Sequence, residues 1–144
     1  MSTNGKKIDV GCGERPHVGY NTYTDIYQPN TSIEGNFVLC SMENMPFADK
    51  EFAYSRCHHV IEHVSNPDCA CKELIRVSKK GTLWFPTPQA ELLFGRGDHR
   101  WFIFVENNKL LFVARRFRPY SIKISCEKSV EFPWEGGFEW EVVY

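Results

Sequence analysis

Two glycines and two acids near the amino terminus have the types and spacing of a nucleoside-binding turn. Asp9-Val10-Gly11-Cys12-Gly13 ends one short apolar segment, and Asp25 ends the next. Glycines directly after a strand let the backbone approach a ligand closely and adopt angles that other residues avoid. A carboxylate at the end of the following strand can accept hydrogen bonds from both hydroxyls of a ribose. The pattern favours a nucleoside site, although a single G-x-G also occurs in plain hairpins and loops.

Histidines form the second group of residues that could do chemistry. Histidine exchanges a proton near neutral pH, so it is a natural general base. The candidates are His58, His59, His63 and His99. We favour His99, because residues 95–101 follow an expected strand and would lie on the rim where a substrate binds. A surface or structural role for each of these histidines remains an alternative.

The elements that must position these residues are short strands and one clear helix. Apolar runs bounded by turn residues predict strands at residues 7–10, 21–26, 37–39, 52–57 and 82–85. Asn66-Pro67 has the form of an N-cap followed by proline at the first helical position, and predicts a helix that ends near 79–81. Residues 106–116 predict a second helix. Residues 120–126 and 138–144 predict a closing antiparallel strand pair.

This order of elements indicates the fold class. Strands alternating with helices predict a single α/β domain over residues 1–144: a Rossmann-like, mostly parallel sheet with an antiparallel C-terminal strand pair and a reduced number of helices. The connections at 13–21 and 27–36 are too short for ordinary helical crossovers. Since parallel sheets are usually covered on both faces, we expect a second subunit, hence a homodimer, or aromatic loops to cover the bare face.

Composition restricts the partners. Seventeen basic and eighteen acidic side chains give a net charge of −1, which provides no field to attract nucleic acid or an anionic membrane. We therefore expect a small-molecule partner, and a solvated face for the basic group that begins at Arg115. No apolar run approaches the ~20 residues of a membrane span. No apolar leader follows Lys6-Lys7, so we expect the six cysteines to be reduced and the protein to be cytoplasmic.

Several motifs, in order, carry a family resemblance. Ile8-Asp-Val-Gly-Cys-Gly13 resembles the first motif of the class I S-adenosylmethionine-dependent methyltransferases, and residues 19–26 resemble their short-loop members of the methyltransferase type 11 kind. Residues 45–52, 59–64 and 72–81 resemble three further stretches of that family. The resemblance covers residues 7–88, and it is far more specific than the glycines alone.

The resemblance implies a role for each matching residue. Asp9, Gly11, Cys12 and Gly13 would surround the methionine part of S-adenosylmethionine, Asp25 would hold its ribose, and Ile26 would pack on its adenine. The turn Ser41, Met42, Glu43 would lie along the adenine edge, and Cys57 with His58 would bring backbone near the sulfonium. Ser41 stands where the family usually has an acid, and a neutral hydroxyl accepts a weaker hydrogen bond from the adenine amino group.

The letters His59-x-x-Glu62-His63 suggest two alternatives that involve a metal. They match an inverted zinc-protease motif, but Asn66-Pro67 interrupts any helix there. They also resemble the E-x-x-E-H with which some methyltransferases bind a divalent ion, with His99 as an added ligand; such a set favours zinc, manganese or iron. Structural histidines explain the pattern more simply, so we predict no metal site.

The sequence thus predicts an S-adenosylmethionine-dependent methyltransferase that acts on a small molecule, for example a sugar or metabolite hydroxyl or amine. Methyl transfer mainly requires donor and acceptor to be held in line, with His99, His59 or His63 available to take a proton. The alternative is a non-catalytic S-adenosylmethionine-binding module, or a subunit that needs a partner. Phe94, Trp101, Phe102 and Phe104 could form a cover over the methyl-transfer site, but we expect most of them to be core or subunit contacts, with Trp101 as a wall of the pocket.

Overall fold

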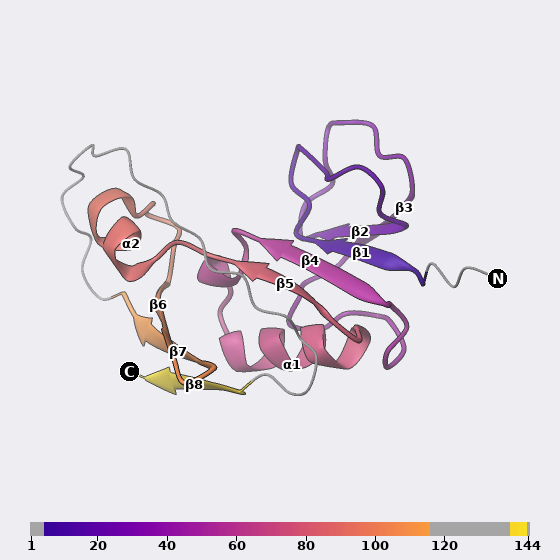
Figure 1. The fold of residues 1–144 in the computed structure, drawn as a ribbon. Coiled ribbons are helices and arrows are strands. Elements are labelled where there is room, and N and C mark those ends of the chain that lie inside the picture. The colour runs from indigo at the N-terminus through magenta and orange to yellow at the C-terminus, as the bar shows by residue number, and fades with distance from the viewer. Residues whose placement is uncertain (1–4, 116–138, 144) are drawn as a thin grey trace.

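A parallel five-stranded sheet forms the centre of the molecule. The computed structural model describes residues 5–115 and 139–143. The sheet contains β1 (Lys7–Val10), β2 (Thr22–Asp25), β3 (Asn36–Leu39), β4 (Tyr54–His58) and β5 (Gly81–Trp84). Its order is β3-β2-β1-β4-β5 and every pairing is parallel (Figure 1). The predicted strands and the Rossmann-like class are confirmed, and neither the β1–β2 nor the β2–β3 connection contains a helix.

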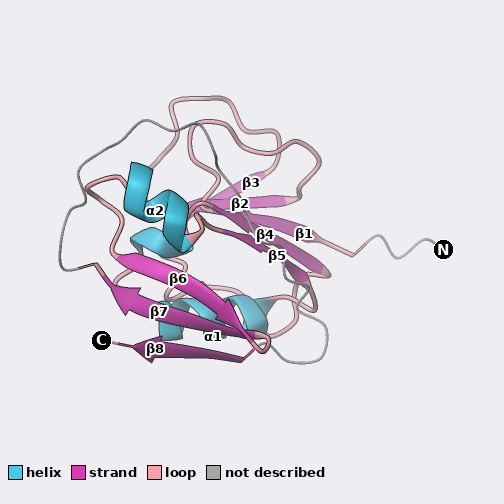
Figure 2. Ribbon diagram, turned by 60° about the vertical axis from the view of Figure 1, so that its left-hand side comes forward, coloured by secondary structure: helices cyan, strands magenta, loops and turns pink. Residues whose placement is uncertain are grey.

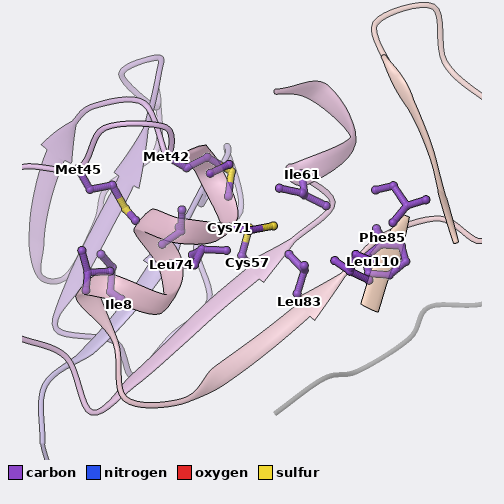
Figure 3. Packing of buried hydrophobic residues seen from close by; sticks show 14 of the residues in the cluster. Ile8, Met42, Met45, Cys57, Ile61, Cys71, Leu74, Leu83, Phe85 and Leu110 are labelled. Atoms are coloured by element: carbon purple, nitrogen blue, oxygen red, sulfur yellow. The ribbon is translucent and has the colours of Figure 1, made fainter. Parts of the chain in front are cut away.

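Helix α1 (Pro67–Val77) covers one face of this sheet. It begins as the sequence predicts: the Asn66 side chain accepts a hydrogen bond from the Cys69 N–H at 3.2 Å, and proline follows the cap. Its apolar side, with Cys71 and Leu74, packs on the strand residues that face it. Those strand residues include Ile8, Cys57 and Leu83 (Figure 3). A side chain of this kind contributes about 1.5–3 kcal/mol on burial, so the α1 face stabilises much of the domain.

Among the described residues, no helix lies over the opposite face of the sheet, and this face is polar and aromatic instead of apolar. Its side chains form polar contacts between neighbouring strands. Arg56 Nη1 lies 3.0 Å from Asp9 Oδ1, and the Tyr54 hydroxyl donates to Thr82 Oγ1 at 3.1 Å. Tyr20, from the β1–β2 loop, packs near Tyr54 with ring centroids 6.5 Å apart. A face built this way tolerates partial exposure, unlike the strands of a fully covered parallel sheet.

The prediction of a helix at residues 106–116 is wrong. Strands β6 (Trp101–Glu106) and β7 (Lys109–Ala114) pair antiparallel instead, joined by Asn107 and Asn108. Both asparagines have positive φ, 49° and 60°. A two-residue type I′ turn, which matches the right-handed twist of the flanking strands, requires positive φ at both positions. The run Leu110-Leu111 fits the period of a helix as well as that of a strand. It forms a strand because it pairs with the aromatic residues of β6.

A three-stranded second sheet results, in the order β6-β7-β8 (Figure 2). The expected strand at 138–144 is confirmed as β8 (Glu139–Val143), but its described neighbour is β7, and the two run parallel. The other half of the predicted closing pair, 120–126, lies outside the described residues. The antiparallel pair in this part of the fold is therefore β6 with β7.

Two short helices were not expected and both lead to the candidate site. α2 (Pro88–Phe94) begins at Thr87, whose hydroxyl accepts from the Ala90 N–H at 3.2 Å, and proline takes its first position. η1 (Ile61–His63) is a single 3₁₀ turn directly after β4. They place Glu91 and Glu62, both almost fully buried, next to the histidines.

One apolar core joins the two sheets. Ile103, Leu110 and Phe112 alternate toward it from the hairpin and meet Ile61, Leu83 and Phe85 (Figure 3). Trp101 is 5% exposed, and its indole N–H donates to the Val64 carbonyl at 2.7 Å, so it is a core residue that also borders the cleft described below. Phe104, by contrast, is 42% exposed.

Two smaller observations bear on the expectations about environment. The cysteines at 12, 40, 57, 69 and 71 are all free thiols in the structure. Within the described residues, the helices are too short or too polar to cross a bilayer.

Candidate functional site

The glycine turn and Asp25 are held directly against each other. The Gly13 N–H donates to Asp25 Oδ2 at 2.9 Å, and the N–H groups of Gly11 and Cys12 both donate to the Thr24 carbonyl, at 2.8 and 2.9 Å. Gly11 and Gly13 have φ of +69° and +59°, which glycine adopts without strain. The end of β1 thus folds over the end of β2, as a nucleoside site between them requires.

A cleft opens at the carboxyl ends of the strands, beside this turn. It has two adjoining parts, a hollow of about 200 Å³ and a wider one of about 1140 Å³. Both parts share Gly11, Asp25, Ile26, Val60, His63, Ser65 and Arg100 in their lining. Ligands of open parallel sheets bind at this edge, where the strand order reverses, here between β1 and β4.

Most of the predicted site residues line this cleft. Gly11, Gly13 and Asp25 form one wall with Ile26, whose side chain is 59% exposed. Ser41, Met42 and Glu43 line the smaller hollow. Ser41 Oγ accepts from the Glu43 N–H at 3.1 Å, so this turn is closed by its own residues. His59, His63 and His99 line the wider part.

Four predicted residues do not line the cleft with their side chains. Asp9 is fully buried; its carboxylate accepts from the His17 N–H at 3.0 Å as well as pairing with Arg56. Cys12 is buried at the turn, where burial and then Asp25 raise the pKa of its thiol to about 11. Asp9 therefore holds the β1–β2 loop in place, and the Cys12 N–H bonds to the Thr24 carbonyl.

The other two, Cys57 and His58, point to opposite faces of β4. Cys57 is fully buried under α1, and burial raises its thiol pKa well above the ordinary value. His58 stacks on Trp84 with ring centroids 4.4 Å apart and contacts Thr82 Oγ1 at 3.2 Å. Burial, and then the charge of Arg56, lower the pKa of His58 to about 4. His58 is thus a neutral aromatic residue of the uncovered face.

We call His59, His63 and His99 the histidine corner. The rings of His63 and His99 are in edge-to-face contact, 4.6 Å between centroids. His99 Nδ1 lies 2.7 Å from Glu91 Oε2, and the other Glu91 oxygen accepts from Arg115 Nη1 at 2.6 Å. The side chain of Arg115 is 3% exposed, so the expectation of a solvated face is wrong for this residue. The neighbours at 116, 118 and 123 lie outside the described residues.

Sequence reasoning missed several residues of the site. Val60 and Arg100 line both parts of the cleft, and each directly follows a residue that was predicted. Glu91 and Arg115 orient His99 from 8 and 16 residues away in the chain. The Thr87-Pro88 cap was a readable signal for the helix that carries Glu91; nothing local indicated its pairing with Arg115.

Fold and site together define an α/β protein with a nucleoside-type cleft at the switch point of a parallel sheet. The model of the methyltransferase domain family matches residues 8–85, more than half of the chain. The chain belongs to this family. The predicted resemblance is thereby confirmed.

Solved structures agree on the fold. A S-adenosylmethionine-dependent methyltransferase from Thermotoga maritima is 17% identical, with a TM-score of 0.54 over 69% of this chain and 57% of that one. A protein from Pyrococcus horikoshii is 23% identical, with a TM-score of 0.51 over 64% and 54%. The plantazolicin methyltransferase, solved with S-adenosylhomocysteine, is 16% identical, with a TM-score of 0.50 over 60% and 40%.

This chain thus spans about half the length of these solved relatives. Among curated proteins, no sequence matches it significantly.

Proposed function

We propose that this chain binds S-adenosylmethionine in the cleft and transfers the methyl group to a small-molecule acceptor with a hydroxyl or amine. The observation that carries the proposal is the contact between the glycine turn and Asp25 at the edge of a five-stranded sheet that belongs to the methyltransferase domain family. One relative of the same fold was solved with S-adenosylhomocysteine.

The residues present fit the nucleoside. Asp25 uses one oxygen for Gly13 N–H and the other for Tyr27 N–H, at 2.9 and 3.2 Å. Each carboxylate oxygen has two lone pairs, so both can still accept from ribose hydroxyls. Ile26 offers an exposed apolar surface for the adenine, with Ser41 beside it in the same hollow.

The residues of the turn fit the remainder of the cofactor. A Cβ built on Gly13 meets nothing within 4 Å, so the backbone there faces open space that a ligand can enter. S-adenosylmethionine, when bound, supplies an electrophilic methyl group on a sulfonium. Gly11 and Gly13 would lie along its methionine part, and Val60 and Trp101 would give the acceptor side two apolar contacts within an otherwise polar lining.

The histidine corner supplies the group that takes the acceptor's proton. His99 is favoured, because Glu91 would orient its ring and stabilise the imidazolium once it forms. His63 and His59 border the same space and are the alternatives. Few other groups need to react, since methyl transfer depends chiefly on alignment of donor and acceptor.

The test is methyl transfer from labelled S-adenosylmethionine to a panel of small hydroxyl and amine acceptors, with wild type and Asp25→Ala. We expect transfer by the wild type and its loss in the variant. Binding of the cofactor without transfer to any acceptor would instead favour the alternative, a module or subunit that needs a partner. Equal transfer by both proteins would contradict the proposal.

We also propose that two copies associate as a homodimer through the uncovered face of the sheet, where the partly exposed Arg56, His58 and Trp84 lie. Light scattering at micromolar concentration measures the mass. A monomer mass would contradict the homodimer and would leave the proposed reaction untouched.

A further inference from the structure

We propose that Glu62, His63 and His99 bind a divalent transition-metal ion beside the acceptor part of the cleft. One carboxylate oxygen and one ring nitrogen from each histidine lie within 4.8 Å of one another. The three residues come from the turn after β4 and from the segment that leads into β6. The fold therefore brings His99 next to Glu62 and His63, although it lies 36 residues beyond His63 in the sequence.

The state of Glu62 is the strongest argument. Its side chain is fully buried, and among the described residues neither carboxylate oxygen has a hydrogen-bond partner. Within the part of the chain that the structure describes, Glu62 Oε1 lies 3.5 Å from His59 Nδ1, too long for a strong hydrogen bond. A buried carboxylate that lacks partners is strongly unfavourable, and proteins place such groups next to opposite charges or metals. A divalent cation would supply the missing partner.

The two histidines are arranged as metal ligands are. Nδ1 of His99 lies 2.7 Å from the buried Glu91, and Nδ1 of His63 lies 3.4 Å from Asp98. A carboxylate at one ring nitrogen fixes the tautomer and leaves the lone pair of the other nitrogen, Nε2, for a metal. Glu91 is itself held by Arg115, so the ring of His99 is oriented by a chain of buried contacts.

The donor set indicates the class of metal. Two imidazoles and one carboxylate suit zinc, manganese or iron(II) better than magnesium or calcium, which prefer oxygen alone. Three protein ligands leave at least one coordination position open. Because His63 and His99 both line the wider part of the cleft, that position would be reached from the side where an acceptor enters.

The use of this metal in methyl transfer rests on the proposed function; its binding does not. A metal-bound hydroxyl loses its proton more readily than a free one. In the metal-loaded protein, His63 and His99 are therefore ligands, and the acceptor is activated by the ion in place of a free histidine base. This assignment differs from the expectation of no metal that the sequence alone favoured. Compared with the metal alternative in the sequence analysis, its ligand set keeps Glu62, His63 and His99 and leaves out His59.

The experiment is metal binding by the full chain, without a purification tag and without S-adenosylmethionine. The protein is stripped with chelator, then titrated calorimetrically with Zn²⁺ and Mn²⁺; Co²⁺ is added as a spectroscopic probe for its visible absorption. Glu62→Gln and His63→Gln remove one ligand each with little change in shape. His17→Gln is the matched control, because His17 is an exposed histidine of the β1–β2 loop that does not line the cleft.

We expect saturable binding by the wild type and His17→Gln, and its loss in Glu62→Gln and His63→Gln. We also expect metal to raise the melting temperatures of the wild type and His17→Gln but not those of the two ligand variants. Without metal, Glu62→Gln should melt higher than the stripped wild type, since it lacks the buried charge. Failure of the wild type to bind any of the three ions, or binding by both ligand variants as tight as that of the wild type, would overturn the metal site. Titration of the same samples with S-adenosylhomocysteine reports on the cofactor site separately, so failure of one proposal is distinguishable from failure of the other.

Discussion

The backbone N–H of Gly13 donates to the carboxylate of Asp25 at 2.9 Å, across the gap between the ends of β1 and β2. This bond joins the glycine turn to the acid expected to hold the ribose, because Gly13 is both a glycine of the turn and the donor to Asp25. It leaves the carboxylate with unused lone pairs that face a cleft. The predictions below follow from this contact and from the buried groups around it.

The two turn glycines have different requirements, so their alanine variants should differ. Both lose glycine's freedom at positive φ, at a cost of about 1–2 kcal/mol in unfolding free energy. At Gly11 a Cβ would also clash with Val60 Cγ2, whereas at Gly13 it meets open space. Urea unfolding should show Gly11→Ala to be clearly less stable than Gly13→Ala, with partial recovery in Gly11→Ala/Val60→Ala. Equal losses in the two single variants would contradict this packing.

The ion pair of Glu91 with Arg115 is buried, with side chains 1% and 3% exposed. Arg115→Met leaves the carboxylate without its cation, and we expect a loss of about 3–5 kcal/mol in unfolding free energy. The control is Arg96→Met, whose pair with Asp98 is exposed and should contribute only about 0–1 kcal/mol. Similar effects of the two substitutions on the urea midpoint would refute a buried pair.

The lowered pKa of His58 predicts a loss of stability in acid. The unfolded chain binds a proton near the ordinary value of 6.5, and the folded chain binds it only near about 4. Between these values the unfolded state holds more protons, so stability falls as pH falls from 6.5 toward 4 and is unaffected by this group above 6.5. His58→Gln, which can still contact Thr82, should lose less stability than the wild type over that range. If the unfolding free energies of the two proteins fell in parallel as the pH was lowered, His58 would not be the cause of the acid loss of stability.

The β6–β7 hairpin depends on two residues with positive φ. Asn108, at φ 60°, tolerates this conformation, but a β-branched residue does not. Asn108→Val should therefore cost about 1–2 kcal/mol in unfolding free energy, and Asn108→Gly should cost nothing or stabilise slightly. Chemical unfolding of both variants tests this conformation of the turn. A valine variant as stable as the glycine variant would refute the positive φ at Asn108.

The parallel sheet and α1 were predictable because their signals are local. Short apolar runs end at turn residues, and Asn66-Pro67 specifies a helix start regardless of what packs on it. The family motifs then placed the glycine turn and Asp25 at one edge. These elements were confirmed within one or two residues at most of their ends, which is the usual uncertainty of helix and strand limits.

The hairpin and part of the site were not predictable, because pairing across the chain decides them. Leu110 fits a helical stripe as well as a strand, and only its position opposite Val105 on β6 resolves the choice. The side chains of Cys57 and His58 do not line the cleft, because adjacent strand residues face opposite sides and both sides lie away from it. The expectation that their backbone lies near the sulfonium stays a prediction. The chain reaches the cleft at His59, where φ turns to 54°.

The most direct test is calorimetric titration of the wild type, Asp25→Ala and Asp49→Ala with S-adenosylhomocysteine. Asp49 is an exposed acid that pairs with Arg76 and does not line the cleft, so it controls for the loss of a carboxylate elsewhere on the surface. The account predicts saturable binding by the wild type and Asp49→Ala, and binding weakened by about 10- to 100-fold or more in Asp25→Ala, where charged hydrogen bonds to the ribose are lost. Absence of binding by the wild type, or equal affinities in all three proteins, would contradict it.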